Sequence, residues 1–318
     1  MPDRCDIRWF KQTFHTKIEA ALQGTPFSLD FLTALGCQET GEVWPILRKT
    51  DLSLDRIVEL CVGDTLDRDH TFPKDKNDLV AVTNPDGQRM FQVARDALVE
   101  MAQFIKGYQG AANNPKKFCK GFGVFQYDLQ FFKDNPDYFL NKEYADFDKC
   151  LARALGELKE AQKKISAIKN KTQLTDLEMA HVAIAYNTGG FNPAKGLKQG
   201  HRPKVNGVPT GPFYGEAIFD FINKAKAVPL EDETETLPFT VDANGPRFKL
   251  KSSKLNLRSE PCVDSGPASN IITTLSQAQG NELQALTNQK VRGFLEVETT
   301  VGNERVRGFA FFDLLQPA

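Results

Sequence analysis

The sequence predicts a mainly α-helical domain followed by a small all-β domain. Three observations lead to this prediction. Apolar residues recur at spacings of three and four over residues 1–226, which places them on one face of successive helices. Residues 227–246 contain no Lys or Arg but several acids and three prolines, a composition typical of a linker. From residue 247 to residue 318, short β-prone runs alternate with turn residues.

Periodicity and capping residues place the helices. Ser28 can cap a helix that carries Phe31 and Leu35 and stops at Gly41. Thr175 and Glu178 fit a capping box. The expected helices cover residues 5–22, 28–40, 53–60, 88–105 and 141–168, a segment that opens at 175, and residues 214–226. The polar stretch 63–86 is expected to be a loop.

The C-terminal part reads as a series of short strands. They are expected at residues 254–258, 271–275, 281–286, 293–299 and 305–311. A domain of this size, about 70 residues, lies near the lower limit of what folds without staples.

Charge and composition exclude several classes of function. With Lys+Arg 40 against Asp+Glu 41, the formal net charge is -1, so bulk electrostatics do not predict a nucleic-acid partner. No window approaches the roughly 20 apolar residues of a membrane span. Charged residues interrupt the first 20 positions, so no signal peptide is expected. Six cysteines lie far apart, which leaves the redox compartment open.

Glu39 is the first candidate for chemistry. It follows Phe31 and Leu35 at a spacing of four, so its carboxyl group is expected to face the protein. It also falls in the last helical turn, where the helix dipole disfavours a carboxylate. Burial and dipole both raise the pKa, as a general acid at neutral pH requires. The alternative is an ordinary solvated glutamate.

The segment Lys120-Gly-Phe-Gly-Val-Phe-Gln-Tyr-Asp128 is the second candidate. Gly121 and Gly123 permit close backbone approaches. Gln126 and Asp128 are two apart and would share one face of an extended segment. An amide and a carboxylate beside a glycine-lined wall suit a polar polymer such as a sugar chain. The alternative is a glycine turn into a buried strand.

Helix ends supply the third set of polar groups. Tyr186 and Asn187 lie where a helix stops before two glycines, and Tyr214 opens the next helix. Their polar ends can project into a cleft. Ordinary capping or packing is the alternative.

Taken in order, these segments resemble the goose-type lysozyme and soluble lytic transglycosylase superfamily. The matching elements are Gln38-Glu39-Thr40-Gly41, Gly121-Phe-Gly-Val-Phe-Gln-Tyr-Asp128, Ala185-Tyr-Asn-Thr-Gly189 and Tyr214. The resemblance implies a lysozyme-like fold over residues 1–226 and cleavage of the β-1,4 bond between N-acetylmuramic acid and N-acetylglucosamine in peptidoglycan. It implies Glu39 as general acid, without metal or cofactor. Substrate-binding roles would fall to Gly123, Gln126, Tyr186, Asn187 and Tyr214.

The sequence departs from that pattern in one respect. Glu39 and Gln126 lie further apart than compact members need, so residues 44–119 would include an inserted segment. Asp128 is the candidate second carboxylate, because the goose-type pattern has an acid there. Water activated by Asp128 would give hydrolysis; without it, the muramoyl 6-hydroxyl would attack and leave a 1,6-anhydro end. Asp64, Asp67, Asp69 and His70 form another acidic cluster, from which an aspartate is the alternative second carboxylate and no metal site is expected.

The C-terminal domain resembles a bacterial SH3 domain. The elements that carry this resemblance are Leu255-Asn-Leu-Arg-Ser-Glu-Pro261, Gly293-Phe-Leu-Glu-Val297 and Gly308-Phe-Ala310. Such domains accompany cell-wall hydrolases, so the resemblance implies binding of wall peptides by residues 247–318. Recognition of another protein, or mere packing on the enzyme, is the alternative.

Other functions remain open at this stage. A Cys-His peptidase or amidase would pair Cys119 or Cys37 with His181. A chitin-cleaving enzyme of the same superfamily and a catalytically silent wall-binding protein are further alternatives.

The expected partners and location follow from the wall substrate. The partners are peptidoglycan glycan strands, wall peptides and a cognate inhibitor or immunity protein, with no nucleic acid and no membrane span. The protein is expected to act outside the cytoplasm. Either it leaves by non-classical export, or the sequence is that of the processed mature form.

Overall fold

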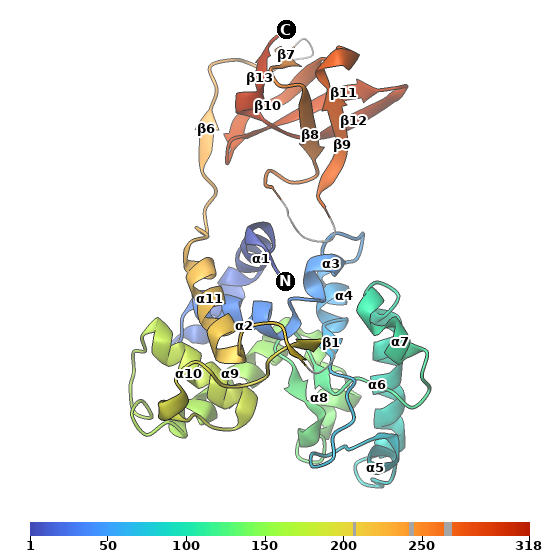
Figure 1. Cartoon of the computed structure of the whole chain (residues 1–318), viewed down its shortest axis with the longest axis vertical. Coiled ribbons are helices and arrows are strands. Elements are labelled where there is room, and N and C mark those ends of the chain that lie inside the picture. Colours follow the sequence, from blue (N-terminus) through green and yellow to red (C-terminus); the bar gives the residue numbers. More distant parts are fainter. Residues whose placement is uncertain (206–207, 242–244, 264–268) are drawn as a thin grey trace. The chain divides into compact units, whose positions relative to one another are not determined.

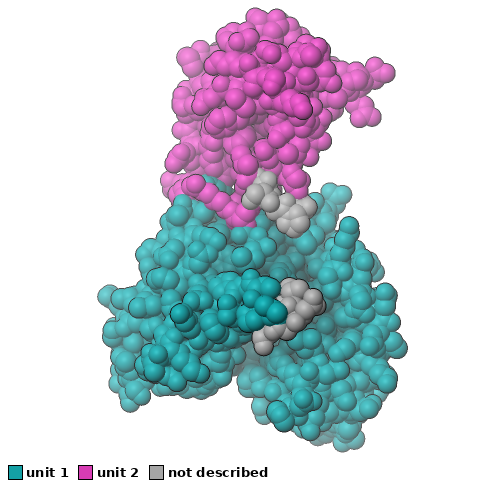
Figure 2. All heavy atoms as spheres, in the orientation of Figure 1, with its two compact units in different colours: residues 1–2, 6–228 teal, residues 3–5, 229–318 magenta. Residues whose placement is uncertain are grey.

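The computed structural model describes the chain except for residues 206–207, 242–244 and 264–268. The described residues form two compact units, coloured separately in Figure 2. Unit 1 comprises Met1–Pro2 and Asp6–Val228, and unit 2 comprises Asp3–Cys5 and Pro229–Ala318. The architecture is a mixed α plus β arrangement, with a helical region and a curled antiparallel sheet (Figure 1). Asp242 of the predicted linker lies outside the described residues.

Helices dominate the first 228 residues. The α-helices described there are α1 (Arg4–Leu22), α2 (Leu29–Thr40), α3 (Trp44–Leu47), α4 (Leu54–Glu59), α5 (Lys76–Val80), α6 (Gly87–Met101), α7 (Gln109–Ala112), α8 (Pro136–Leu140), α9 (Phe147–Lys163), α10 (Asp176–Thr188) and α11 (Tyr214–Lys226). Short 3₁₀ turns η1 (Lys106–Tyr108), η2 (Leu129–Phe131), η3 (Glu143–Ala145) and η4 (Pro193–Lys195) join them. Within the described chain, no helix is both long enough and apolar enough to cross a bilayer.

The caps expected from the sequence are confirmed. The Ser28 hydroxyl accepts a hydrogen bond from the amide of Phe31 at 3.2 Å and starts α2. Both hydrogen bonds of the capping box between Thr175 and Glu178 are present at the start of α10. Local capping chemistry therefore fixes where these two helices begin.

Two expected segments differ from the structure. The stretch 63–86 is not entirely loop, because the Asp75 side chain caps α5 and its Leu79 is fully buried. The expected helix 141–168 begins later and ends earlier. The Asp146 carboxylate accepts hydrogen bonds from the amides of Asp148 and Lys149, so it caps α9 after the η3 turn.

Helix α2 lies in the core of unit 1. Phe31, Leu32 and Leu35 are fully buried, and α2 packs against α10 and α11. Aromatic rings fill the neighbouring space, with Phe14 stacked on Phe147 at a centroid distance of 3.9 Å. This packing holds the C-terminal end of α2 against the N-terminal end of α11.

Unit 1 also contains a small antiparallel sheet of order β1-β2-β3. The strands are β1 (Val62–Gly63), β2 (Gly121–Phe122) and β3 (Tyr127–Asp128). Gly63 pairs with Gly121, and Gly121 pairs with Asp128. Strand β4 (Lys204–Val205) pairs with β5 (Val208–Pro209) in a separate antiparallel arrangement. The sheet brings residues that are far apart in the sequence into one register.

Unit 2 is a curled antiparallel sheet of order β13-β7-β10-β11-β12-β8-β9 (Figure 1). Its strands are β7 (Arg247–Leu250), β8 (Lys254–Arg258), β9 (Ile271–Ser276), β10 (Leu283–Val291), β11 (Phe294–Val301), β12 (Glu304–Phe311) and β13 (Leu315–Pro317), with 3₁₀ turns η5 (Gln277–Gln279) and η6 (Phe312–Leu314). Leu257, Leu283, Leu295 and Val297 are fully buried in its core.

Three strands of unit 2 were not expected. Strand β6 (Thr234–Thr236) lies inside the predicted linker and pairs with β10. Strands β7 and β13 pair with each other at the chain end. The side chains of β6 are exposed, so it joins the sheet through its backbone and leaves no hydrophobic pattern in the sequence.

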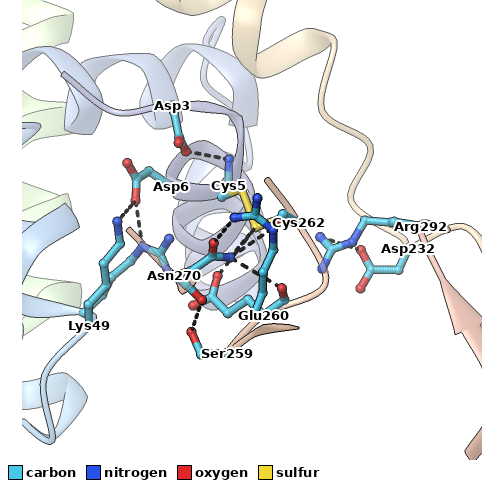
Figure 3. Close-up of a disulfide and its surroundings, with 12 residues drawn as sticks. Asp3, Cys5, Asp6, Lys49, Asp232, Ser259, Glu260, Cys262, Asn270 and Arg292 are labelled. Atoms are coloured by element: carbon cyan, nitrogen blue, oxygen red, sulfur yellow. Dashed lines mark hydrogen bonds and ion pairs between the residues drawn. A yellow bond between two sulfur atoms is a disulfide. The ribbon is translucent and has the colours of Figure 1, made fainter. Parts of the chain in front are cut away.

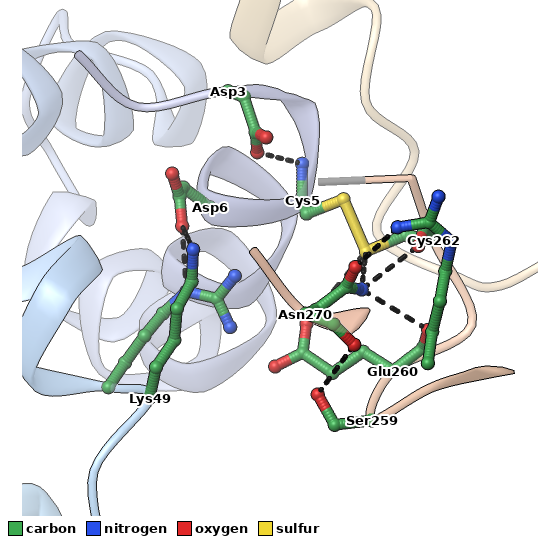
Figure 4. A network of polar contacts seen from close by, with 10 residues as sticks. Asp3, Cys5, Asp6, Lys49, Ser259, Glu260, Cys262 and Asn270 are labelled. Carbon is green, nitrogen blue, oxygen red and sulfur yellow. Dashed lines mark hydrogen bonds and ion pairs between the residues drawn. A yellow bond between two sulfur atoms is a disulfide. The ribbon is translucent and has the colours of Figure 1, made fainter. Parts of the chain in front are cut away.

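A disulfide joins Cys5 to Cys262 across 257 positions of sequence, within unit 2 (Figure 3). The Asn270 side chain donates to the carbonyl of Cys262 at 2.9 Å and accepts from Arg258 at 2.7 Å, so a polar network surrounds the bridge (Figure 4). The remaining cysteines (Cys37, Cys61, Cys119, Cys150) are free thiols and buried. The sequence spacing alone had left this pairing undetermined.

Candidate active site

Glu39 and Tyr214 form the centre of the candidate site. Glu39 lies in the last turn of α2, and Tyr214 is the first residue of α11. The Tyr214 hydroxyl donates a hydrogen bond to Oε1 of Glu39 at 2.6 Å. The amide of Tyr214 donates to the carbonyl of His201 at 2.8 Å, which fixes the start of α11. Two of the expected site residues are therefore in direct contact.

The electrostatics of Glu39 suit a proton donor. Burial raises the pKa of the Glu39 carboxyl to about 7, while the hydrogen bond from Tyr214 acts in the opposite direction. Near neutral pH a substantial share of the molecules therefore carries the proton on Glu39. The Tyr214 hydroxyl binds Oε1 of Glu39, so Oε2 is not hydrogen-bonded to Tyr214.

The glycine-rich segment is tied to the two helix ends. The Thr40 hydroxyl donates to the carbonyl of Val124 at 2.7 Å, and the Tyr186 hydroxyl donates to the carbonyl of Phe125 at 2.6 Å. Burial raises the pKa of Tyr186 well above its usual range, and the Glu39 charge adds to that rise. The segment from Gly121 to Asp128 therefore lies beside the end of α2 and the end of α10.

The backbone of this segment corrects one expectation. Gln126 has φ 53, so it is left-handed, and Gln126 and Asp128 do not share a face of an extended strand. The side-chain amide of Gln126 donates to the carbonyls of Gly123 and Cys61, at 3.0 Å and 3.3 Å, and so closes the turn between β2 and β3. In this structure Gln126 shapes the loop.

Gly123 is required by the same turn. Its φ of 79 is rarely adopted by other residues, and a Cβ atom there would lie 2.6 Å from Sγ of Cys150. The backbone of Val124 and Phe125 and the side chain of Tyr138 surround the Cys150 thiol. Cys150 thus packs against the loop that contains Gly123.

Asn187 lies near the Glu39–Tyr214 pair but does not join it. It is exposed near the end of α10. A Cβ atom on Gly200 would lie 3.1 Å from Oδ1 of Asn187 and 2.6 Å from Cβ of Tyr214. Both side chains therefore border Gly200, whose lack of a side chain keeps the space between them open.

Asp128 makes a different set of contacts. Its Oδ2 accepts a hydrogen bond from Nη1 of Arg68 at 2.9 Å, and its Oδ1 accepts one from the amide of Gln130 at 2.8 Å. Burial raises the pKa of Asp128, against the opposing effects of these two partners. Arg68 also pairs with Asp64, which directly follows β1. The two aspartates thus share one guanidinium group.

The rest of the predicted acidic cluster pairs elsewhere or is exposed. Asp67 pairs with Lys117 at 2.9 Å, and Asp69 and His70 are exposed. Among the residues that the structure describes, no group of His, Cys, Asp and Glu is arranged to hold a metal ion.

The thiols and the histidine of the alternative Cys-His reading have other surroundings. Burial raises the pKa of both Cys37 and Cys119, so neither thiol is favoured as a thiolate. His181 stacks on Phe191 with ring centroids 4.1 Å apart. These are the features of packed side chains.

Sequence reasoning missed three supporting residues. Thr40 belongs to the Gln38-Glu39-Thr40-Gly41 element, but no sequence pattern shows that its hydroxyl binds the loop. Cys150 gives no pattern that could reveal its contact with the loop. Arg68 follows Asp64 at a spacing of four, which is a weak signal for an ion pair.

Comparisons of this chain with protein-family models, with curated proteins and with solved structures found no match.

Proposed function

We propose that this protein cleaves the β-1,4 bond between N-acetylmuramic acid and N-acetylglucosamine in peptidoglycan, with Glu39 as the general acid. The observation that carries the proposal is the half-buried carboxyl of Glu39, which has a pKa of about 7 and is held by the Tyr214 hydroxyl at 2.6 Å. A protonated carboxyl group at a fixed position is what glycosidic bond cleavage needs. The goose-type sequence elements around Glu39, Gln126, Tyr186 and Tyr214 support the same reaction.

Cleavage begins with proton transfer. Glu39 gives its proton to the glycosidic oxygen while the bond from that oxygen to C1 of N-acetylmuramic acid breaks, and positive charge develops on the sugar ring. Glu39 is then a carboxylate. Tyr214 donates to that carboxylate, and the hydrogen bond strengthens as the negative charge appears.

Either of two alternative second steps can complete the reaction. In hydrolysis, water bonds to C1 and gives its proton to a carboxylate, for which Asp128 is the candidate, and one water is consumed. In the other route, the 6-hydroxyl oxygen of the same N-acetylmuramic acid bonds to C1 and its proton returns to Glu39. The product is then a 1,6-anhydro end, and no water is consumed.

The lysozyme-like assignment of unit 1 and the SH3-like assignment of unit 2 belong to this proposal. The helical unit with a small three-stranded sheet, and the curled antiparallel sheet of the second unit, are compatible with them. Unit 2 would bind wall peptides and raise the local concentration of the enzyme at an insoluble substrate.

The disulfide supports a location outside the cytoplasm. Disulfides persist in oxidising compartments and are rare in the cytosol. The Cys5–Cys262 pairing therefore agrees with action on cell wall in the periplasm or outside the cell.

The test is Glu39→Gln. This variant keeps the shape of the side chain and its contact with Tyr214 but has no proton to give. We expect a loss of turbidity clearing on purified peptidoglycan of at least about 10²-fold, with binding to the insoluble wall unchanged. A variant that still clears peptidoglycan at the rate of the unaltered protein would refute the proposal. Activity on chitin but not on peptidoglycan would redirect it to the chitin-cleaving alternative.

A further inference from the structure

Arg68 joins two aspartates that lie on opposite sides of β2. Nη1 of Arg68 contacts Oδ2 of Asp128 in β3 at 2.9 Å, and Nη2 contacts Oδ2 of Asp64, which directly follows β1. In the sheet, β2 lies between these two strands. One guanidinium group therefore spans the sheet and holds a carboxylate at each side of it.

Every oxygen atom of the two carboxylates accepts a hydrogen bond from the protein. Arg68 donates a hydrogen bond to one oxygen of each carboxylate. The remaining oxygens accept from backbone amides two residues onward, with Leu66 donating to Asp64 at 3.1 Å and Gln130 donating to Asp128 at 2.8 Å. At Asp128 these bonds act against burial, which raises the pKa of its carboxyl.

Other charges face the same cluster. The ammonium group of Lys120 donates to the carbonyl of Lys74 at 3.0 Å and acts electrostatically with Asp64, Asp67, Arg68 and Asp128. The amide of Arg68 donates to that same carbonyl of Lys74 at 3.1 Å. Lys120 thus fixes the loop that carries Arg68.

The cluster is connected to Glu39 through the glycine-rich segment. Thr40, next to Glu39, holds Val124, and Gln126 of the same loop lies against Gly63, the residue before Asp64. A Cβ atom on Gly63 would lie 2.9 Å from Oε1 of Gln126. The loop between β2 and β3 therefore contacts both the Glu39 turn and the strand end that carries Asp64.

We propose that Arg68 is a positioning residue that determines the product of cleavage: it keeps Asp128 paired and so prevents it from activating water, and cleavage ends in the 1,6-anhydro product. This inference rests on the function proposed above. A proton taken from water would neutralise Asp128 and weaken its charge-assisted bond to Arg68. Arg68 therefore opposes proton uptake by Asp128, whereas burial favours it. The 6-hydroxyl route does not need Asp128, because the proton returns to Glu39.

The experiment compares reducing ends with 1,6-anhydro ends by mass spectrometry of the released muropeptides. The full-length chain is used unaltered and as Arg68→Gln, Arg68→Lys, Asp128→Asn and the double variant Arg68→Gln/Asp128→Asn. We expect mainly anhydro ends from the unaltered protein. In Arg68→Gln the ratio of reducing to anhydro ends should rise by about tenfold or more, because Asp128 is released to accept a proton. The double variant should lose this gain.

Arg56→Gln is the matched control. Arg56 also bridges two carboxylates, Glu59 and Glu100, each at 2.5 Å, and its exposed fraction of 32% is close to the 36% of Arg68. Loss of Arg56 should leave the product ratio unchanged. Arg68→Lys keeps the positive charge but offers one ammonium group to two carboxylates, so the ratio of reducing to anhydro ends should rise by less than in Arg68→Gln. This variant also tests the proposal if Arg68→Gln does not fold.

The outcomes separate the two proposals. An unaltered protein that releases no glycan product overturns both. Cleavage that depends on Glu39 but yields mainly reducing ends, or a product ratio that neither Arg68 variant changes, overturns only the role of Arg68. A gain that persists in the double variant also overturns it, because the gain would not pass through Asp128.

Discussion

The hydroxyl of Tyr214 donates a hydrogen bond of 2.6 Å to the carboxyl of Glu39, across 175 positions of sequence. The contact exists because α2 and α11 pack along one another and bring the end of one helix to the beginning of the other. The bond favours the ionised form of Glu39, whereas burial favours the protonated form. The balance of these two effects sets the pH range in which Glu39 can donate a proton.

Tyr214→Phe should shift the pH dependence of cleavage. Activity of the unaltered protein should fall as the pH rises above about 7, because Glu39 loses its proton there. Without the Tyr214 hydroxyl, burial acts with less opposition and the pKa of Glu39 rises. The fall should therefore move to higher pH, as measured by rates of peptidoglycan clearing between pH 5 and about pH 9.

Tyr127→Phe is the control for that shift. The Tyr127 hydroxyl accepts from Asn135 at 3.0 Å and makes no contact with Glu39. Its pH profile should coincide with that of the unaltered protein, and an equal shift in both variants would contradict the assignment.

Glu39→Gln should change how stability depends on pH. The pKa of Glu39 rises from 4.5 to about 7 on folding, so its ionisation opposes folding as the pH increases through that interval. Below about pH 4.5 the carboxyl is protonated in both states, and the variant should match the unaltered protein. Above about pH 7 the variant should be more stable by about 3 kcal/mol in denaturant titrations. A constant difference across this range would contradict the raised pKa.

Gly123→Ala should destabilise unit 1. The residue has φ 79, and its added Cβ would meet Sγ of Cys150 at 2.6 Å. We expect a loss of about 1–3 kcal/mol together with reduced activity, because the loop beside Glu39 must move. Gly156→Ala offers the opposite case, since Gly156 lies inside α9 with open space around it and should gain up to about 1 kcal/mol. Thermal unfolding of both variants gives the comparison.

Thiol alkylation under native conditions should not affect cleavage. Cys37, Cys61, Cys119 and Cys150 are buried, and burial raises the pKa of each thiol, so the reactive thiolate is scarce. Iodoacetamide treatment followed by a clearing assay checks this. Inactivation with one cysteine labelled would favour the Cys-His alternative instead.

Reduction should lower the thermal stability of unit 2. The bridge between Cys5 and Cys262 restricts the conformations of the unfolded chain. Bridges of this kind contribute about 2–4 kcal/mol to the free energy of unfolding. Adding dithiothreitol should lower the unfolding midpoint of the unaltered protein. It should have no effect on Cys262→Ser, which starts at the lower midpoint. Equal sensitivity of both proteins to the reductant would mean that the bridge is not formed.

The sequence predicted well what is decided locally. Ser28, Thr175 and Glu178 start helices because their side chains satisfy nearby backbone amides, and that signal lies within four residues. The half-buried position of Glu39 followed from its spacing behind Phe31 and Leu35. These features need no knowledge of the rest of the chain.

What depends on distant contacts was not predictable. Gln126 has a left-handed backbone, and its side-chain amide bonds to Gly123 and Cys61, of which the second lies 65 positions away. The Arg68 bridge exists only because the sheet pairs Gly63 with Gly121 and Gly121 with Asp128. Strand β6 forms through backbone pairing with β10 and carries no apolar pattern.

The Cys5–Cys262 bridge has a consequence for proteolysis of the chain. It closes the polypeptide into a ring that contains every peptide bond from residue 5 to residue 262. A single cut within that ring, for example in the exposed acidic stretch at Glu231 and Glu233, opens the ring without releasing a fragment. The nicked protein would migrate as one chain on a gel until reductant is added, and units 1 and 2 would remain one molecule.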